Sequence, residues 1–354
     1  MTASSNNSSP AEASVSAAPT INLALQGGGV HGAFAWGAID RLLADGRLEI
    51  AAVSATSAGA LNAVVLKCGL LSGGPVAARE RLASLWHEIG RLGSAFNPGP
   101  LLWWERWLFG AHLDLAPSYR VARLMTHIWS PYEINPLNVN PLRSIVADHV
   151  DFERLSRTDE LPKLFLSATN VRTGKIKIFD RSEISLDAVM ASACLPQIFQ
   201  AVEIDGEHYW DGGFMGNPAI YPLIYEGNCN DVLIVHINPL KRQDVPRSAE
   251  EITNRVNEIS MNSSLMREMR AIAFVTRLID EGALDPASYH RMRIHSIRAD
   301  AELASLSAAS KVHADWTFIQ HLAEIGRQAA GDWLETSFEA VGKRSSVDIA
   351  QVFL

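Results

Sequence analysis

The sequence predicts an α/β fold built on a mainly parallel central sheet, with a helical region towards its C-terminal end. Three observations support this prediction: an apolar strand-like run at residues 21–26, a second at residues 48–55, and a helix-like stretch after each. Strand, helix, strand and helix therefore follow one another within about fifty residues. Such an alternation is typical of parallel strands joined by right-handed crossovers.

Local signals place the remaining elements. Gly46 ends the first helix, and an amphipathic pattern predicts a further helix over residues 75–92. Two strands around a glycine turn are expected at residues 163–180. Further elements are a helix ended by Pro196, a central strand at residues 231–238, a strand-like stretch at 289–297 and a long helix at 316–340.

Changes in composition divide the chain. Residues 1–19 are rich in Ser, Ala and Asn and predict a disordered tail, because they have neither the basic nor the apolar region of a signal peptide. Residues 20–240 form the main domain, which is interrupted at 94–151 by an insertion rich in Pro, Gly and Trp. Residues 241–354 are expected to be mostly helical and to pack on the main domain.

The composition argues against several classes of partner. The 354 residues are 47% hydrophobic with a mean hydropathy of +0.04, and the formal net charge is −8. Without a basic stripe, this charge argues against nucleic acid as a partner. Cys68, Cys194 and Cys229 are scattered, as in a reduced cytosolic protein. No uncharged apolar run approaches the roughly 18–20 residues of a transmembrane helix, so we expect a soluble cytoplasmic protein. The polar tail is also compatible with export that needs no cleaved signal.

A glycine-rich loop follows the first strand and has two interpretations. Gly27, Gly29 and Gly32 match the G-x-G-x-x-G fingerprint of a dinucleotide site. That site also needs an acid at the end of the second strand, whereas Glu49 stands at its start. The other interpretation is an oxyanion hole, in which the unhindered N–H groups of Gly27, Gly28 and Gly29 converge at a helix N-terminus. The missing acid favours the oxyanion hole over a dinucleotide-binding oxidoreductase.

Ser57 stands where the second strand meets the next helix. A nucleophilic serine needs such a sharp turn, and its neighbours must be small. Ala55, Ala58 and Gly59 meet that requirement, although Ala55 departs from the usual G-x-S-x-G pattern. The alternative is a serine that only caps the helix. The glycine loop on the neighbouring strand favours the nucleophile.

A serine nucleophile needs a base, and two arrangements remain open. Asp211, followed by Gly212 and Gly213, can act directly if a water-poor pocket raises its basicity. A Ser–Asp–His triad would instead recruit a histidine after Ser57, and His236 fits the chain order.

Two further histidines lie near these motifs. His208 precedes Asp211 by three residues and could orient it, although a surface hairpin is the more common setting for such a residue. His31 lies in the glycine loop, ahead of the serine in the chain.

Together these motifs resemble those of the patatin-like phospholipases. GGGVHG, ATSAG and DGGFMGNP occur in the family's order and spacing, and ATNVRTGKIKIF and MASACLPQIFQAVEIDGEHYWDGG are similar to its connecting segments. The resemblance covers roughly residues 21–238 and implies a three-layer α/β/α fold. It also implies hydrolysis of a lipid or other acyl ester, without metal or cofactor.

Carried over to this sequence, the resemblance implies Ser57 as nucleophile and Asp211 as general base. It implies an oxyanion hole at residues 27–29, with supporting roles for Gly32, Ala55, Gly59, Gly212 and Gly213. The sequence departs from the family at Ala55 and at His31, which stands where a basic residue is usual.

The insertion contains LLWWERWLFG, with Trp103, Trp104, Trp107 and Leu108 near one side of an expected helix and Phe109 beside them. Three interpretations apply to this segment. A core helix over the sheet and a lid or acyl-chain wall over the site are equally favoured. An anchor for transient contact with a membrane surface is the third.

Overall fold

The computed structural model describes residues 18–96, 128–227, 229–242, 244–306 and 308–354. Its strands are β1 (Thr20–Leu25), β2 (Glu49–Thr56), β3 (Lys163–Asn170), β4 (Ile176–Asp180), β5 (Val202–Ile204), β6 (Glu207–Asp211), β7 (Asp231–Val235) and β8 (Arg293–Ile297). Its α-helices are α1 (Gly32–Asp45), α2 (Ala58–Phe96), α5 (Pro131–Ile134), α6 (Pro141–His149), α7 (Phe152–Arg157), α8 (Leu186–Ser192), α9 (Tyr221–Glu226), α10 (Ala249–Asp280), α11 (Asp300–Ala304), α12 (Trp316–Thr336) and α13 (Ile349–Phe353). Short 3₁₀ turns include η1 (Gly29–His31), η4 (Gly212–Phe214) and η5 (Ala308–Val312).

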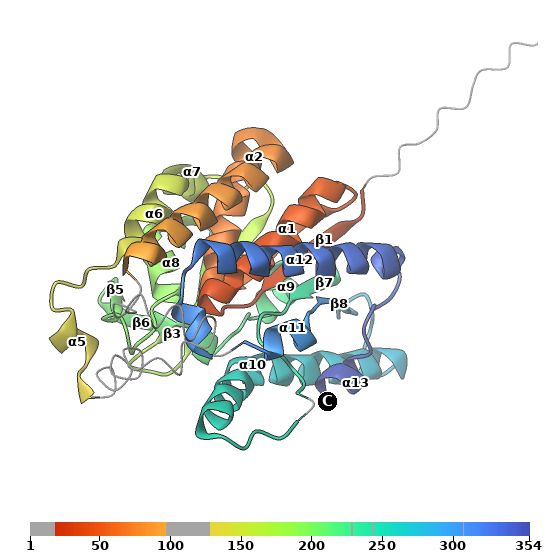
Figure 1. Ribbon diagram of the computed structural model, residues 1–354. Helices are drawn as coiled ribbons and strands as arrows, with labels where there is room; N and C mark the ends of the chain where they lie inside the picture. The colour runs from red at the N-terminus through yellow and green to blue at the C-terminus, as the bar shows by residue number, and fades with distance from the viewer. Residues whose placement is uncertain (1–17, 97–127, 228, 243, 307) are drawn as a thin grey trace, which may run out of the picture.

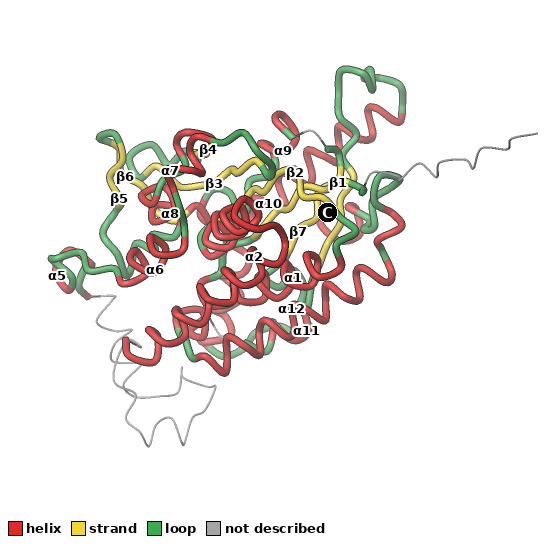
Figure 2. Tube along the Cα trace, turned by 90° about the horizontal axis from the view of Figure 1, so that it is seen from above, coloured by secondary structure: helices red, strands yellow, loops and turns green. Residues whose placement is uncertain are grey.

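One mixed sheet forms the middle of the molecule. Its strands follow the order β5-β6-β3-β2-β1-β7-β8, and β4 pairs with β3. The pairs β3–β2, β2–β1, β1–β7 and β7–β8 are parallel, whereas β4, β5 and β6 add antiparallel pairs at one end. Figure 2 shows this band of strands from β5 and β6 to β1 and β7. The sheet confirms the predicted mainly parallel fold, and its carboxyl edge gathers the ends of β1, β2 and β7.

Helices cover both faces of the sheet, which confirms the three layers. Leu23 and Leu25 of β1 point into a core shared with α1, α2, α6, α8 and α12. Ala24, between them, points into a second core shared with α9, α10 and α13. The alternation follows from the two-residue period of a strand. In Figure 1, α12 runs beside α1 on one side of the sheet, and α10 and α13 lie on the other.

The boundaries of the first helices follow from local chemistry. Gly46 adopts a left-handed conformation with φ 73° and ends α1, as predicted. Helix α2 is broken at Gly73 and Gly74, where the latter has φ 71°, so its two parts match the two predicted helices. Within the described ranges, one helix, Ala58–Gly93, is long and apolar enough to cross a membrane by length and composition. Because 56% of its most apolar window is buried and the break divides it, we interpret it as a core helix.

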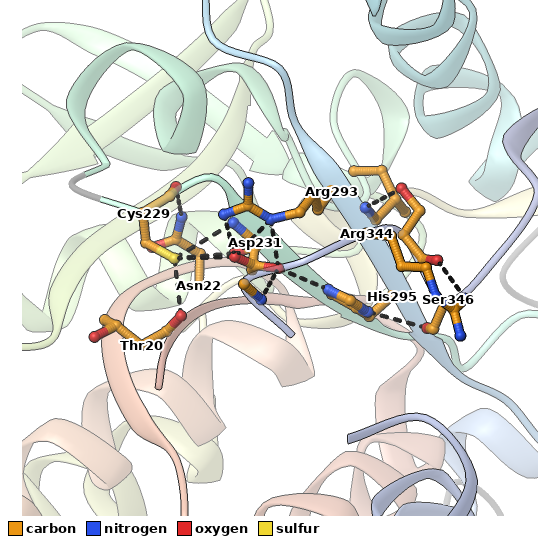
Figure 3. Close-up of polar contacts among 11 residues, drawn as sticks. Thr20, Asn22, Cys229, Asp231, Arg293, His295, Arg344 and Ser346 are labelled. Carbon is orange, nitrogen blue, oxygen red and sulfur yellow. Dashed lines mark hydrogen bonds and ion pairs between the residues drawn. The ribbon is translucent and has the colours of Figure 1, made fainter. Parts of the chain in front are cut away.

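The C-terminal region contributes to the same sheet. Strand β8 pairs with β7 from Asp231↔Arg293 to Val235↔Ile297. At the start of this pair, the buried carboxylate of Asp231 accepts hydrogen bonds from Arg293 Nη2 at 2.6 Å, His295 Nε2 at 3.0 Å and the Gly342 N–H at 3.0 Å. Figure 3 shows this cluster, with Arg293 and His295 of β8 pointing towards Asp231 of β7. The predicted boundary at residue 240 therefore falls between two paired strands, and the division into domains stays a prediction.

Candidate active site

Ser57 lies on a strained turn between β2 and α2. Its φ of 56° is in the left-handed region, which is uncommon for a residue with a side chain. Its N–H donates to Ser192 Oγ at 2.9 Å, and its carbonyl accepts from the N–H groups of Ala60 and Leu61. Strain of this kind is concentrated at functional sites, and the geometry is that of a strand-to-helix nucleophile turn.

The glycine loop between β1 and η1 lies directly beside this turn. A Cβ atom on Gly27 would lie 2.6 Å from Ser57 Cβ, and one on Gly32 would lie 2.5 Å from Ala58 Cβ. A Cβ on Gly59 would lie 2.5 Å from the carbonyl oxygen of Leu25. The small residues singled out in the sequence therefore let two chain segments approach each other. The N-terminal ends of α1 and α2, which carry partial positive charge, meet at Ser57.

The three loop glycines differ in what their N–H groups do. The Gly27 N–H donates to Asn217 Oδ1 at 2.6 Å. The N–H groups of Gly28 and Gly29 donate no hydrogen bond to any residue that the structure describes. Gly29 has φ 59°, which favours glycine there. Two backbone donors of the loop are thus unpaired among the described residues, and a third, next to Ser57, is held by an asparagine side chain.

The sheet places Asp211 next to Ser57. Ser167 of β3 pairs with Thr56 of β2, and the next residue of β3, Ala168, pairs with Asp211 of β6. Since β4 occupies the other side of β3 at these positions, β6 continues where β2 ends. Asp211 therefore comes within reach of the residue after Thr56. The Ser57 side chain lies close enough to the Asp211 carboxylate to lower the pKa of that carboxyl.

Asp211 is 3% exposed, and its surroundings suit a base. Burial raises the pKa of Asp211 to about 6, although the Ser57 hydroxyl, the Gly213 N–H and the charge of Lys311 act in the opposite direction. The Gly213 N–H donates to Asp211 Oδ1 at 2.7 Å. A carboxylate with this pKa is ionised at neutral pH and is more basic than an exposed one. The nearby Cys194 thiol stays protonated, because burial raises its pKa to about 12.

The chain after Asp211 is fixed against β2 and β3. A Cβ on Gly212 would lie 2.1 Å from the carbonyl oxygen of Ser167, so only glycine fits this approach. Thr56 Oγ1 and Ser167 Oγ both donate to the carbonyl of Gly216, at 2.7 and 3.0 Å. These hydroxyls hold the segment that carries Asp211.

The histidines considered from the sequence lie apart from this pair. His208 is half exposed, and its Nε2 lies 3.8 Å from Glu203 Oε2. His236 is buried against Phe353, and neither of its ring nitrogens has a hydrogen-bond partner among the described residues. His31 Nε2 shares a hydrogen bond of 2.7 Å with Ser310 Oγ. Across the described ranges, no histidine is hydrogen-bonded to Ser57 or Asp211.

The positive charge near the glycine loop comes from Lys311 and not from His31, the residue at the position where the family usually has a basic side chain. Burial, together with the charge of Lys311, lowers the pKa of His31 to about 3, so this side chain is neutral. Lys311 of η5 approaches the loop instead, and its Nζ donates to Asn238 Oδ1 at 2.8 Å. The sequence interpretation missed Lys311, Asn217 and Asn238. Only Asn217 had a local signal, since it stands in the quoted DGGFMGNP.

The described part of the chain contains no group of three or more His, Cys, Asp or Glu side chains placed to hold a metal ion. A dinucleotide site would need an acid at the end of β2, but Glu49 is exposed at the first position of that strand. It therefore lies at the opposite end of that strand from the glycine loop.

A comparison with known families identifies the chain. The model of the patatin-like phospholipase family matches residues 23–224, a span that contains the glycine loop, Ser57 and Asp211. The chain belongs to the patatin-like phospholipase family. The resemblance noted in the motifs is thereby confirmed, as is the predicted enzyme class, since the family is one of ester hydrolases. A search of curated proteins gives no match.

Solved structures similar to this patatin-like chain include one protein from Legionella pneumophila and one from Pseudomonas aeruginosa. VipD from Legionella pneumophila is 14% identical with a TM-score of 0.38, and the match covers 89% of this chain and 66% of VipD. ExoU, in its heterodimeric complex with SpcU from the type III secretion system of Pseudomonas aeruginosa, is 19% identical with a TM-score of 0.39. That match covers 91% of this chain and 52% of the other. The chain thus spans between half and two thirds of the length of these proteins.

The predicted Trp-rich helix with Trp103, Trp104, Trp107, Leu108 and Phe109 lies outside the described residues, as does most of the predicted tail. Of the described part of the predicted insertion, residues 94–96 end α2, and residues 128–151 contain α5, α6 and the approach to α7.

Proposed function

We propose that this protein is a lipid acyl hydrolase in which Ser57 and Asp211 act as a catalytic dyad. The observation that carries the proposal is that Ser57, on a strained turn packed against Gly27, acts on the buried Asp211 carboxylate. A serine hydroxyl is a weak nucleophile until a base accepts its proton. Asp211 is the proposed base, because it is a buried carboxylate whose pKa the Ser57 side chain lowers.

In the first half of the proposed reaction, Ser57 Oγ attacks the carbonyl carbon of an acyl ester while its proton moves to the Asp211 carboxylate. The negative charge that develops on the carbonyl oxygen is stabilised by backbone N–H groups. When the tetrahedral intermediate collapses, the C–O bond to the alcohol breaks. Asp211 returns the proton to the leaving alkoxide, and the acyl group remains on Ser57.

In the second half, water attacks the acyl-Ser57 carbonyl and Asp211 accepts the proton of the water. The second intermediate collapses to a carboxylic acid, and the proton returns to Ser57 Oγ. Because the same carboxylate accepts and returns a proton in each half, a pKa of about 6 suits both directions near neutral pH.

The oxyanion hole is proposed to consist of the N–H groups of Gly28 and Gly29. The sequence motif suggested all three glycines, but the Gly27 N–H is engaged by Asn217 at 2.6 Å. We propose that Gly27 serves as the fixed base of the loop. Asn217 and Asn238 both contact its backbone, and this holds the two following donors beside Ser57.

A fluorophosphonate probe tests this function directly, because it reacts with an activated serine. We expect the wild-type protein to be labelled and to hydrolyse p-nitrophenyl butyrate. Ser57→Ala and Asp211→Asn should each abolish hydrolysis in a protein that remains folded by circular dichroism. His208→Ala and His236→Ala serve as matched controls and should retain activity.

Three results would contradict the proposal. Loss of activity in a folded histidine variant with near-normal activity in Asp211→Asn would indicate a triad. A folded wild-type protein that the probe does not label would indicate a lipid-binding protein without catalysis. Saturable binding of a nicotinamide dinucleotide would favour the oxidoreductase. Acyl lipids as substrates and the cytoplasm as location remain parts of this proposal.

A further inference from the structure

Lys311 of η5 stands next to the proposed oxyanion loop, although more than 250 residues separate it from that loop in the chain. A Cβ atom on Gly29 would lie 2.2 Å from the carbonyl oxygen of Lys311, so the two backbones are in close contact. Lys311 also lines a small cavity together with His31 of η1 and Asn257 of α10. A segment beyond the part of the chain that matches the family therefore lies against the proposed oxyanion loop.

The Lys311 ammonium is held by two amide oxygens. Its Nζ donates to Asn238 Oδ1 at 2.8 Å and to Asn257 Oδ1 at 2.9 Å. The amide nitrogen of Asn238 in turn donates to the carbonyl oxygen of Gly27 at 3.0 Å. Lys311, Asn238 and the Gly27 peptide thus form a chain of hydrogen bonds that ends in the glycine loop.

This chain has a direction, because an ammonium group can only donate. Lys311 requires the oxygen of the Asn238 amide to face it, which turns the amide nitrogen towards the Gly27 carbonyl. The flipped amide would place donors against Lys311 and an oxygen against the Gly27 carbonyl. The cation therefore selects the one orientation of Asn238 that supports the loop.

The charged groups around Lys311 are few. His31 is neutral for the reasons given above, and Glu258 of α10 is paired with Arg242 at 2.6 Å and Arg255 at 3.1 Å. Among the residues that the structure describes, the other carboxylate that interacts with Lys311 is Asp211. Burial lowers the pKa of Lys311 to about 8, against the charges of Glu258 and Asp211, so the ammonium is still mostly protonated at neutral pH.

We propose that Lys311 is a positioning residue for the reaction of Ser57. Its ammonium orients Asn238, and through it the Gly27 peptide that fixes the oxyanion loop, and its positive charge favours the ionised form of Asp211. The inference rests on the proposed Ser57–Asp211 chemistry and assigns to the C-terminal region a part in that chemistry.

The test is the pH profile of kcat/KM for p-nitrophenyl butyrate, with the product measured after an alkaline quench. Lys311→Met keeps the length of the side chain and removes its charge. We expect a loss of roughly tenfold to a hundredfold at neutral pH. The acid limb of the profile should move to higher pH, because an uncompensated carboxylate is harder to ionise. Lys311→Arg keeps the charge, so its acid limb should stay where the wild type has it.

Lys343→Met is the matched control, since it removes the same charge at an exposed lysine paired with Glu339. Its profile should equal that of the wild type. A folded Lys311→Met protein with an unshifted acid limb would overturn the inference, and so would an equal shift in Lys343→Met. If Lys311→Met does not fold, Asn257→Ala tests the inference instead, because it removes one acceptor of the Lys311 ammonium. We expect this variant to have a lower kcat/KM than the wild type, and an unchanged kcat/KM would overturn the inference.

Failure of the inference and failure of the proposed function give different results. If Ser57→Ala retained activity, the dyad itself would be wrong whatever Lys311 does. If Ser57→Ala and Asp211→Asn are inactive while the Lys311→Met profile is that of the wild type, only the role of Lys311 is refuted.

Discussion

Asn217→Ala is the most informative single change for the proposed oxyanion loop. Asn217 is fully buried, and its side chain contacts Gly27 twice: Oδ1 accepts the Gly27 N–H at 2.6 Å, and Nδ2 lies 3.4 Å from the Gly27 carbonyl oxygen. Alanine removes both contacts. The Gly27 carbonyl keeps Asn238 as a partner, whereas the Gly27 N–H loses its acceptor.

The size of the effect follows from these contacts. A buried N–H left without an acceptor costs about 1–3 kcal/mol in the free energy of unfolding. Catalysis should suffer separately, because the Gly28 and Gly29 donors are positioned by the residue before them. Loss of one aligned oxyanion donor lowers kcat by roughly 10²–10³-fold. We therefore expect kcat to fall by roughly a hundredfold with a smaller change in KM, since the donors act on the transition state.

Steady-state hydrolysis of p-nitrophenyl butyrate and urea unfolding measure the two effects, and Asn22→Ala separates them. Asn22 is equally buried, near the start of β1, and its Nδ2 donates to the Cys229 carbonyl at 2.8 Å. The Asn22→Ala protein should therefore have a lower free energy of unfolding than the wild type and the same kcat. If Asn217→Ala kept a wild-type kcat, or exceeded it, the reasoning would be refuted. The freed Gly27 N–H would then itself be a donor to the oxyanion.

Three further predictions concern pH and stability. The kcat/KM of the wild type should rise as the pH increases through about 6, because Asp211 must lose its proton to act as a base; a pH–rate profile that is flat there would contradict this role. Asp231→Asn should lower the free energy of unfolding by about 3–5 kcal/mol in urea titrations at neutral pH, since it leaves the Arg293 charge unpaired. Hydrogen bonds from His295 and Arg293 outweigh the effect of burial and hold the pKa of the Asp231 carboxyl well below its usual range. The ionised Asp231 therefore stabilises the wild type fully at any pH above the pKa of Asp231 in the unfolded chain. As the pH falls through the pKa of Asp231 in the folded protein, the difference in free energy of unfolding between Asp231→Asn and the wild type should disappear. Gly326→Ala should destabilise the protein by more than about 2 kcal/mol, because its Cβ would lie 2.0 Å from the carbonyl oxygen of Phe34. In the same helix, the Cβ of Gly331→Ala would lie 3.6 Å from Arg41 Nε, so this change should stabilise the protein by about 0.5–1 kcal/mol. Equal melting temperatures for the two variants would refute the packing argument.

Local patterns in the sequence predicted much of the fold. The alternation of strands and helices, the end of α1 at Gly46 and the break before Pro75 each depend on a few adjacent residues, and the structure has all of them. Ser57 was singled out from its small neighbours and its place after a strand, and its turn is strained as that interpretation expects; its role as nucleophile stays a prediction.

Contacts between distant parts of the chain could not be found in this way. Asn217 lies 190 residues after Gly27, and no spacing rule relates the two. The neutral state of His31 depends on burial and on Lys311, neither of which the motif GGGVHG encodes. The pairing of β8 with β7 likewise results from the closure of the whole sheet.

That pairing has a consequence for when the protein can become active during synthesis. Ser57 and Asp211 leave the ribosome early, but β7 is then an unprotected sheet edge of five buried residues, and the glycine loop lacks η5. A further hundred residues separate Asp211 from Lys311, which corresponds to about 5–20 s of translation at typical rates. If Lys311 has its proposed role, the nascent chain carries the nucleophile and its base for that interval without a completed loop. The proposed hydrolase would thus acquire its activity only after the chain has been made as far as Lys311.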